Sequence, residues 1–391
     1  MASAPSARVR AMSVSDRLLF DVPAGTVYLD TAAQGPRLRT VLAAGHAAID
    51  ASTAPWRLGT APWRAAIERV RHLAAGCLDG DPDGVALVPS AAYGLAVAAR
   101  NIPLARGEAV AVLDGQFPSN LLCWQQRCAE TGAGLHAIAR GGGEWTGAVL
   151  DILDRVRGLR VLTLPHAYWH DGAWLDLDAI SARCHDRGVS LVLDLSQSLG
   201  ALPVALARWR PDFVVSVGHK WMLGPTGLAY LWAAPHWRAH GVSIEQHWTA
   251  RAVDDWRFPA DSATPWRDGA RRFDAGGITD PLRLSMAEAA LGQLHDWGLA
   301  SLPERLGART RALDAALRDA GLEACVSDGH APHFTGVRVP TGRMDAVGAA
   351  LDAVGIVCTR RHGLLRVAPH LHVDEADMTR VAETIAAAMR G

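Results

Sequence analysis

The stretch DFVVSVGHKWMLGPTGLAYLW, residues 212–232, contains two apolar runs that flank a single lysine, Lys220. Short runs rich in Val and Leu are typical of strands buried on both faces of a sheet. Between them, Gly-Pro-Thr-Gly predicts a turn, so we expect the two strands to pair antiparallel. A lysine at the end of a buried strand loses solvation, which favours the neutral, nucleophilic amine over the ammonium.

Similar apolar runs alternate with helical patterns along the chain before this stretch. The expected strands are residues 85–90, 109–114, 134–139, 160–165, 190–196, 213–218 and 227–232. Alternation of this kind predicts a doubly wound α/β domain whose mostly parallel, seven-stranded sheet is covered by helices. Ligands of such sheets bind outside the carboxyl ends of the strands, so polar residues that follow the runs are candidates for a site.

The C-terminal part predicts a different, smaller α+β unit. Helical patterns at 281–298 and 301–321 precede a strand–helix–strand–helix order, and Ser301 with Glu304 predicts a capping box for the second helix. We therefore expect a flexible leader over 1–20, a large domain over 21–280 and a small C-terminal domain over 281–391. The N-terminal segment of the large domain is a candidate to join the small one.

Composition excludes several classes of protein. The 391 residues carry a formal net charge of −1 and are 49% hydrophobic, so no excess of positive charge favours nucleic acid or an anionic membrane as a partner. No apolar run reaches the roughly 18 residues that a membrane-spanning helix needs. Six scattered cysteines without CxxC pairs indicate free thiols, which are typical of the reducing cytoplasm.

Several polar or aromatic residues follow the expected strands. Asp194 and Gln197 lie in SLVLDLSQS, Lys220 follows the next strand, Phe117 lies in GQFPSNLLCW, and Ser90 begins a helix in VPSAAYG. Pyridoxal phosphate requires such a set: its aldehyde reacts with a lysine, and its protonated ring nitrogen pairs with a carboxylate. Its ring needs a flat partner, and its phosphate suits a helix N-terminus.

With these motifs the sequence resembles the class V aminotransferases, a branch of the fold-type-I pyridoxal-phosphate enzymes. The resemblance runs from YLDTAAQGP (28–36) to LLRVAPHLHVDEADM (364–378), and its most specific parts are Asp194-x-x-Gln197 and GHKWMLGPTG. The branch includes cysteine desulfurases, selenocysteine lyases, isopenicillin N epimerase and kynureninase. The resemblance implies the fold-type-I transferase fold and a homodimer in which both subunits build each site.

The resemblance also implies roles for particular residues. Lys220 would bind the cofactor as a Schiff base and transfer protons at the substrate Cα, while Asp194 would hold the ring nitrogen. Gln197 would bind the ring hydroxyl, and Arg366 would bind the substrate α-carboxylate with its guanidinium fork. The other implied contacts are His219, Ser90, Ala91, Ala92 and Gly277 near the phosphate, Phe117 and Trp169 near the ring, and Ala33 at the substrate.

The sequence also departs from the branch. Desulfurases carry a catalytic cysteine on a loop before the carboxylate-binding arginine, whereas here Cys358 precedes Arg366 in what reads as a strand. We therefore do not expect a persulfide on the enzyme. Where the partner subunit of relatives often offers a threonine to the phosphate, this chain has Gly276 and Gly277, which offer only backbone.

Function remains divided among several alternatives at this stage. A lyase resembling C–S lyases, or an epimerase, is favoured, with an aminotransferase as the alternative. A metal-dependent hydrolase would use the paired histidines His166/His170 or His370/His372, and an inactive binding protein would have lost its phosphate contacts. Phe117 and Trp169 could be plain core residues, and Arg360 and Arg361 could simply face solvent.

Overall fold

A computed structural model of the chain describes residues 15–57, 59–141, 144–252, 264–361 and 363–390. Its main sheet has seven strands in the order β2–β8–β7–β6–β5–β3–β4. The strands are β2 (Val85–Val88), β3 (Ala109–Leu113), β4 (Gly134–Ile138), β5 (Leu159–Pro165), β6 (Ser190–Asp194), β7 (Phe213–Val217) and β8 (Ala229–Ala233). The seven apolar runs of the sequence thus lie in one sheet.

Strand direction in this sheet is mostly parallel. The strands from β3 to β7 run parallel, whereas β8 is antiparallel to both of its neighbours, β7 and β2. The runs on either side of Lys220 are β7 and β8, with Val217 paired to Ala229, so their expected antiparallel pairing is confirmed. The carboxyl ends of β2, β3, β5, β6 and β7 consequently lie at one edge.

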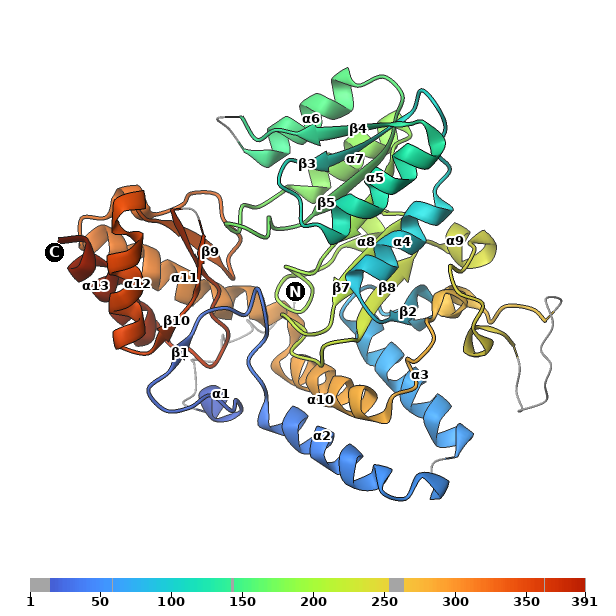
Figure 1. Cartoon of the computed structure of the whole chain (residues 1–391), viewed down its shortest axis with the longest axis horizontal. Helices are drawn as coiled ribbons and strands as arrows, with labels where there is room; N and C mark the ends of the chain where they lie inside the picture. Colours follow the sequence, from blue (N-terminus) through green and yellow to red (C-terminus); the bar gives the residue numbers. More distant parts are fainter. Residues whose placement is uncertain (1–14, 58, 142–143, 253–263, 362, 391) are drawn as a thin grey trace, which may run out of the picture.

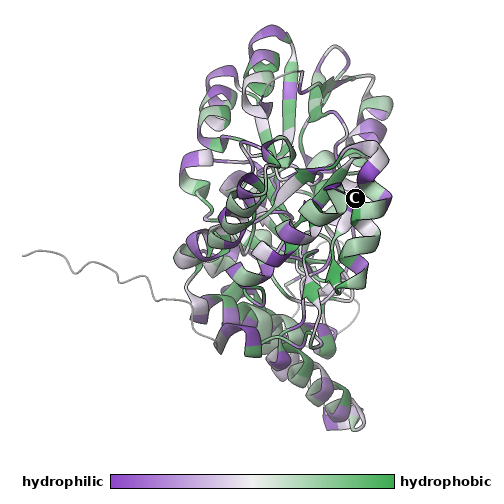
Figure 2. Ribbon diagram, turned by 90° about the vertical axis from the view of Figure 1, so that its left-hand side faces the viewer, coloured by the Kyte–Doolittle hydropathy of each residue, from purple (hydrophilic) through white to green (hydrophobic). Residues whose placement is uncertain are grey.

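Helices cover both faces of the sheet (Figure 1). Alternate residues of β3 belong to two different buried clusters, as expected where successive side chains point to opposite faces. One cluster includes residues of α6 (Trp145–Arg155) and α7 (Leu177–Arg187), and the other includes residues of α4 (Ala91–Asn101) and α5 (Ser119–Thr131). Figure 2 shows the apolar residues on the interior strands and polar residues along the outer sides of helices. This is the predicted α/β architecture.

Three long helices pack together beside the sheet. They are α2 (Arg39–Ser52), α3 (Thr60–Gly76) and α10 (Pro281–Trp297), and α10 contacts both of the others. Gly45 lets α10 approach α2 closely, because a Cβ at this position would lie 3.2 Å from the Met286 sulfur. A helix from the second half of the chain is thereby fixed to the first half.

The C-terminal elements form a second unit beside the large sheet (Figure 1). Its antiparallel sheet has the order β11–β12–β9, and a parallel pair joins β1 to β10. The strands are β1 (Val27–Tyr28), β9 (Thr335–Arg338), β10 (Ile356–Val357), β11 (Thr359–Arg361) and β12 (Leu364–Val367). The helices are α11 (Leu302–Asp319), α12 (Met344–Ala353) and α13 (Glu375–Arg390). The N-terminal strand β1 thus forms part of the C-terminal unit.

The remaining elements are short. They are α1 (Ser15–Leu18), α8 (Leu206–Trp209), α9 (Pro235–His240) and the 3₁₀ turns η1 (Pro55–Arg57), η2 (Pro82–Gly84), η3 (Trp248–Ala250), η4 (Gly269–Phe273), η5 (Leu299–Ser301), η6 (Glu323–Cys325) and η7 (Thr341–Arg343). None of the described helices is long and apolar enough to cross a membrane.

Two local expectations are wrong. Ser301 does not cap α11, because η5 leads directly into this helix and the Ser301 hydroxyl donates to the carbonyls of Trp297 and Gly298. Glu304 instead pairs with Arg311. Cys358 lies between β10 and β11 and not within a strand.

The division into domains stays a proposal. Residues 1–14 of the expected leader lie outside the described residues. At its other end Phe20 is buried, with its ring centroid 5.8 Å from that of Trp297. The boundary at residue 281 separates α10 in sequence from α2 and α3, against which it packs.

Candidate active site

A cavity of about 230 Å³ lies at the carboxyl edge of the main sheet. Residues at or just after the ends of β2, β3, β5, β6 and β7 contribute to its wall. The lining residues are Ser90, Ala91, Ala92, Gln116, Phe117, Ser119, Pro165, Trp169, Asp194, Ser196, Gln197, Val217, His219 and Lys220. Most of the residues singled out from the sequence therefore meet in one place.

Lys220 occupies the turn between β7 and β8, at the side of the cavity. Its Nζ lies 5.4 Å from the centre of the Phe117 ring. The pKa of the Lys220 amine is lowered to about 8. Burial is the main cause, the charges of Arg366 and Arg361 act in the same direction, and those of Asp194 and Asp30 oppose the shift. The amine is thus partly neutral near physiological pH, which suits both covalent attachment to an aldehyde and proton transfer.

Asp194 ends β6 with a carboxylate that is 8% exposed. One carboxylate oxygen accepts a hydrogen bond from the Ser196 backbone N–H at 3.0 Å. Within the described residues no arginine, lysine or histidine forms an ion pair with it. A buried carboxylate that faces a cavity without an ion-pair partner is suited to a cationic ring nitrogen.

Gln197 is held in one orientation by its neighbours. Its Nε2 donates to the Ala32 carbonyl at 2.9 Å, and its Oε1 accepts from the Trp221 indole N–H at 3.1 Å. An indole nitrogen can only donate, so Trp221 fixes which end of the amide carries oxygen. The second Nε2 hydrogen remains for a ligand. His333 adds a hydrogen bond to the Gln197 backbone carbonyl at 2.5 Å.

The end of the cavity near α4 offers neutral donors. The Ser90 hydroxyl caps α4 by accepting from the Tyr93 N–H at 3.1 Å, and the helix N-terminus favours an anion. Burial, with the charges of Lys220 and Arg37, lowers the pKa of His219 to about 4, so its imidazole is neutral. Gln116 is 5% exposed, and its Nε2 is buried without a hydrogen-bond partner among the described residues.

Sequence analysis did not single out Gln116, Ser119, Ser196 or Trp221. The position of Gln116, immediately before Phe117 and directly after a predicted strand, was a usable signal. Nothing in the sequence indicated the contact between Trp221 and Gln197, because it depends on two loops meeting at the sheet edge.

Phe117 and Trp169 form an aromatic wall. Their ring centroids are 5.6 Å apart in an edge-to-face arrangement, and the Trp169 indole donates to the Gly115 carbonyl at 2.9 Å. Phe117 is 40% exposed, so it is not the plain core residue that was the alternative for it.

Three residues that the resemblance implicated do not line this cavity. Arg366 is 2% exposed, and it donates to the Trp169 carbonyl at 2.9 Å and to Asp30 at 2.8 Å. Ala33 is exposed in the turn after Asp30, to whose carbonyl its N–H donates. Gly277 is exposed, with a φ of +78°, on the loop before α10.

Comparison with known proteins identifies the group to which this site belongs. Residues 27–382 match the family described as aminotransferase class V, which covers most of the chain. The chain belongs to the class V aminotransferase family. Membership makes it a pyridoxal-phosphate-dependent enzyme, as the sequence resemblance implied.

Relatives of this class V enzyme carry the names of different reactions. It is 26% identical over 336 residues to an uncharacterised aminotransferase, YcbU, of Bacillus subtilis, covering 82% of this chain and 83% of that protein. It is 30% identical over 236 residues to a kynureninase of Deinococcus radiodurans, covering 59% and 57%. It is 26% identical over 353 residues to a cysteine desulfurase of Klebsiella pneumoniae, covering 86% and 83%.

Solved structures support the same fold. The cystine C–S lyase C-DES, in complex with cysteine persulfide, superposes with a TM-score of 0.81 at 20% identity, covering 93% of this chain and 98% of that one. The apo cysteine desulfurase of Thermococcus onnurineus gives 0.79 at 18% identity, covering 94% and 95%.

The cavity of this class V enzyme fits pyridoxal phosphate. Asp194 is a buried carboxylate suited to the ring nitrogen, Lys220 is an amine of lowered pKa, and the N-terminus of α4 suits the phosphate. Gln116 Nε2 is a donor that a bound group could satisfy.

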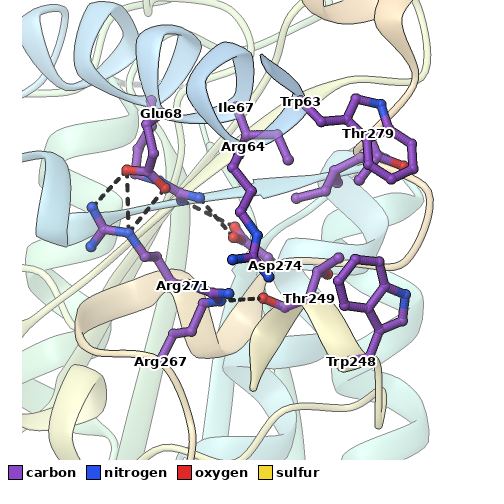
Figure 3. Close-up of a pocket in the computed structure, with 12 residues that line it drawn as sticks. Trp63, Arg64, Ile67, Glu68, Trp248, Thr249, Arg267, Arg271, Asp274 and Thr279 are labelled. Atoms are coloured by element: carbon purple, nitrogen blue, oxygen red, sulfur yellow. Dashed lines mark hydrogen bonds and ion pairs between the residues drawn. The ribbon is translucent and has the colours of Figure 1, made fainter. Parts of the chain in front are cut away.

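A second cavity, of about 210 Å³, lies between α3, η3, η4 and the loop before α10 (Figure 3). Four of its charged residues form ion pairs: Arg71 pairs with Asp274, and Arg271 pairs with Glu68. This arrangement fixes α3 to the segment that leads into α10.

The paired histidines His370 and His372 and the cysteines do not line the cavity at Lys220. His370 and His372 are buried near Phe20, and no group of three or more His, Cys, Asp or Glu within the described ranges could hold a metal ion. All six cysteines are free thiols, and none lines the cavity at Lys220.

Proposed function

We propose that this class V enzyme is a β-elimination lyase that acts on an amino acid with a thiol-derived group on Cβ. One observation carries the choice: Lys220 provides an amine of lowered pKa in the cavity, and none of the six cysteines reaches it. Relatives named cysteine desulfurases support a sulfur-bearing substrate. Without a thiol to take up sulfur, the substituent would leave directly.

The proposed chemistry assigns a task to each part of the site. Bound pyridoxal phosphate supplies an electron sink for the pair left at Cα. The Cα–H bond breaks with transfer of the proton to Lys220 Nζ, and the Cβ–S bond breaks as the sulfur leaves with the electron pair and takes up a proton. The 2-aminoacrylate that is released adds water, which gives pyruvate and ammonia.

The other residues would bind and orient the cofactor and the substrate. Asp194 would hold the ring nitrogen, Gln197 the ring hydroxyl through its remaining N–H, and Phe117 one face of the ring. The N-terminus of α4, with Ser90, Ala91 and Ala92, would bind the phosphate together with His219. Arg366 Nε is buried without a partner in the described residues, and we propose this N–H for the substrate α-carboxylate.

Cys358 gives further support for elimination. Burial raises the pKa of its thiol to about 11, so little thiolate is present at neutral pH. Burial likewise raises the pKa of Cys123 to about 12, with a smaller contribution from the charge of Asp194. Thiols in this state are poor nucleophiles toward a substrate sulfur.

The test uses the cofactor-loaded enzyme in deuterium oxide with a panel of L-amino acids that includes cysteine and its S-conjugates. We expect thiol, pyruvate and ammonia in equal amounts from a sulfur-bearing substrate, and none from the Lys220→Ala variant. Keto acid that forms only when an amino acceptor is present would replace the proposal with transamination. Deuterium at Cα without loss of the β-substituent would replace it with epimerisation.

Two further properties belong to the proposal. We propose a homodimer, in which the loop with Gly277 would lie near the partner's phosphate site, and sedimentation at several protein concentrations tests this. We also propose a cytoplasmic location, which the six free thiols support.

A further inference from the structure

The hairpin of β11 and β12 places two arginines on one face. Thr359 pairs with Arg366 and Arg361 pairs with Leu364 across the antiparallel strands. Because side chains alternate along a strand, Thr359, Arg361 and Arg366 share a face, and Arg360 points the other way. Arg361 and Arg366 are diagonal neighbours, with backbones roughly 7–8 Å apart.

The charges on this face are unequally compensated. Arg366 pairs with Asp30 at 2.8 Å, and the opposite-facing Arg360 pairs with Asp352. In the part of the chain that the structure describes, the Arg361 guanidinium makes no hydrogen bond or ion pair, and its Nε is buried without a partner. A half-buried guanidinium with five unused donors is costly unless an anion completes it.

Arg361 lies beside the wall of the cavity, behind Trp169, and is not itself a lining residue. Its guanidinium carbon is 4.7 Å from the centre of the Trp169 ring, and Trp169 lines the cavity. Its charge is one of those that lower the pKa of Lys220, so its field reaches the reacting amine. Burial, and then the charge of Arg366, lowers the pKa of Arg361 itself, and the opposing charge of Asp30 does not cancel this shift.

We propose that Arg361, stacked on Trp169, binds a second anionic group at the far end of the substrate side chain. The enzyme would thus select amino acids whose β-substituent carries a carboxylate or a similar anion. This inference rests on the proposed function, because it assigns the far end of the same substrate. The guanidinium fork suits a carboxylate, and the diagonal spacing lets Arg366 and Arg361 each bind one of the two anions.

The test compares two substrates that differ in one charge. S-carboxymethyl-L-cysteine carries the distal carboxylate, and S-carbamoylmethyl-L-cysteine is its neutral isostere. We expect the holoenzyme to prefer the carboxymethyl compound by about 10- to 100-fold in kcat/KM, measured as pyruvate released. Arg361→Gln should abolish this preference, mainly through a higher KM for the anionic substrate. Arg361→Lys should restore part of it.

Arg360→Gln is the matched control, because the residue is adjacent, faces away and pairs with Asp352. It should keep the preference of the unchanged enzyme. Melting temperature and cofactor absorbance verify that each variant is folded and loaded. Equal losses for both substrates in Arg361→Gln would overturn the inference, since Arg361 would then serve a part that both share, such as the α-carboxylate.

A binding measurement separates this inference from the proposed lyase activity. Each compound is titrated against the holoenzyme and followed by the change in cofactor absorbance, with no turnover required. Tighter binding of the anionic compound that depends on Arg361, without pyruvate, would sustain the inference and reject the lyase. Pyruvate from both compounds at equal efficiency would support the lyase and reject the role of Arg361. Absence of both binding and pyruvate would reject both.

Discussion

At Lys220, burial and the neighbouring charges act on one amine in opposite directions. Burial is the largest influence and favours the neutral form, Arg366 and Arg361 act in the same sense, and the carboxylates of Asp194 and Asp30 favour the charged form. The outcome is a pKa of about 8, well below the usual 10.5 of a lysine. The amine therefore retains reactivity at neutral pH without losing its basicity.

This pKa predicts how the apoenzyme takes up its cofactor. Only the neutral amine attacks an aldehyde, so the rate should rise roughly tenfold from pH 7 to pH 9 and then level off. Stopped-flow absorbance of the protein-bound cofactor measures it. Asp194→Asn should move the midpoint to lower pH, because it removes a charge that raises the pKa. A rate still climbing steeply at pH 10 would contradict the prediction.

Trp221 and Gln197 show how one hydrogen bond can define a binding group. Trp221→Phe keeps most of the packing but leaves Gln197 Oε1 buried without its donor, which costs about 1–2 kcal/mol. We expect lower stability and a several-fold weaker affinity for pyridoxal phosphate, because the amide is no longer held with its N–H toward the cavity. Urea unfolding and cofactor titration measure the two effects.

A double-mutant cycle supplies the control. If the contact acts through Gln197, then Trp221→Phe should have little additional effect on cofactor affinity in a Gln197→Leu background. Independent, additive effects would show that Trp221 acts by packing alone.

At the scale of elements, the helices that follow the strands bring their N-termini to the sheet edge. Ser90 caps α4 at the cavity, whereas Asp176 caps α7 away from it by accepting from the Ala179 N–H. The two caps are alike in type and differ in their distance from the site, which allows structural and binding effects to be separated.

We expect Ser90→Ala and Asp176→Ala each to lower the free energy of unfolding by about 1 kcal/mol. Only Ser90→Ala should also weaken cofactor binding, since Ser90 lines the cavity and its hydroxyl can donate to an anion there. Thermal unfolding of the apoenzymes and equilibrium titration with pyridoxal phosphate measure these quantities. Equal cofactor affinity in the two variants would show that the Ser90 hydroxyl does not contact the phosphate.

At the scale of the whole molecule, distant parts of the chain are joined at a few buried points. The guanidinium of Arg71, on α3, is 1% exposed and donates to both carboxylate oxygens of Asp274, at 3.0 and 2.7 Å. Asp274 also accepts from the Leu87 N–H in β2. Figure 3 shows Asp274 near Arg271 and Glu68, where α3 meets the segment before α10.

Asp274→Asn should therefore be strongly destabilising, by about 3–5 kcal/mol, because it removes the buried carboxylate that binds Arg71 through two hydrogen bonds and leaves that charge with only its contact to Glu68. The exposed pair Asp151–Arg155 on α6 provides the comparison, and Asp151→Asn should have a much smaller effect. Chemical unfolding curves measure both. A loss in Asp274→Asn no larger than that in Asp151→Asn would contradict the buried pair's proposed role.

The seven strands of the sheet, their mostly parallel order and the family were evident from the sequence. Each of these depends on local chemistry: apolar runs of strand length, a glycine-rich turn after Lys220, and an Asp-x-x-Gln motif at a strand end. Most of the candidate residues that follow strands line one cavity, because parallel strands bring their carboxyl ends to one edge.

Only the tertiary structure decided which side chains compensate one another. The pairing of Arg366 with Asp30 joins positions far apart in the chain, and Trp221 meets Gln197 across two loops. Among the described residues, Arg361 Nε is buried without a hydrogen-bond partner. The packing of α10 on α2 and α3 and the pairing of β1 with β10 are equally non-local. Periodicity along a sequence reports which face of an element is buried, whereas burial, charge compensation and the resulting pKa values depend on what the folded chain places opposite that face.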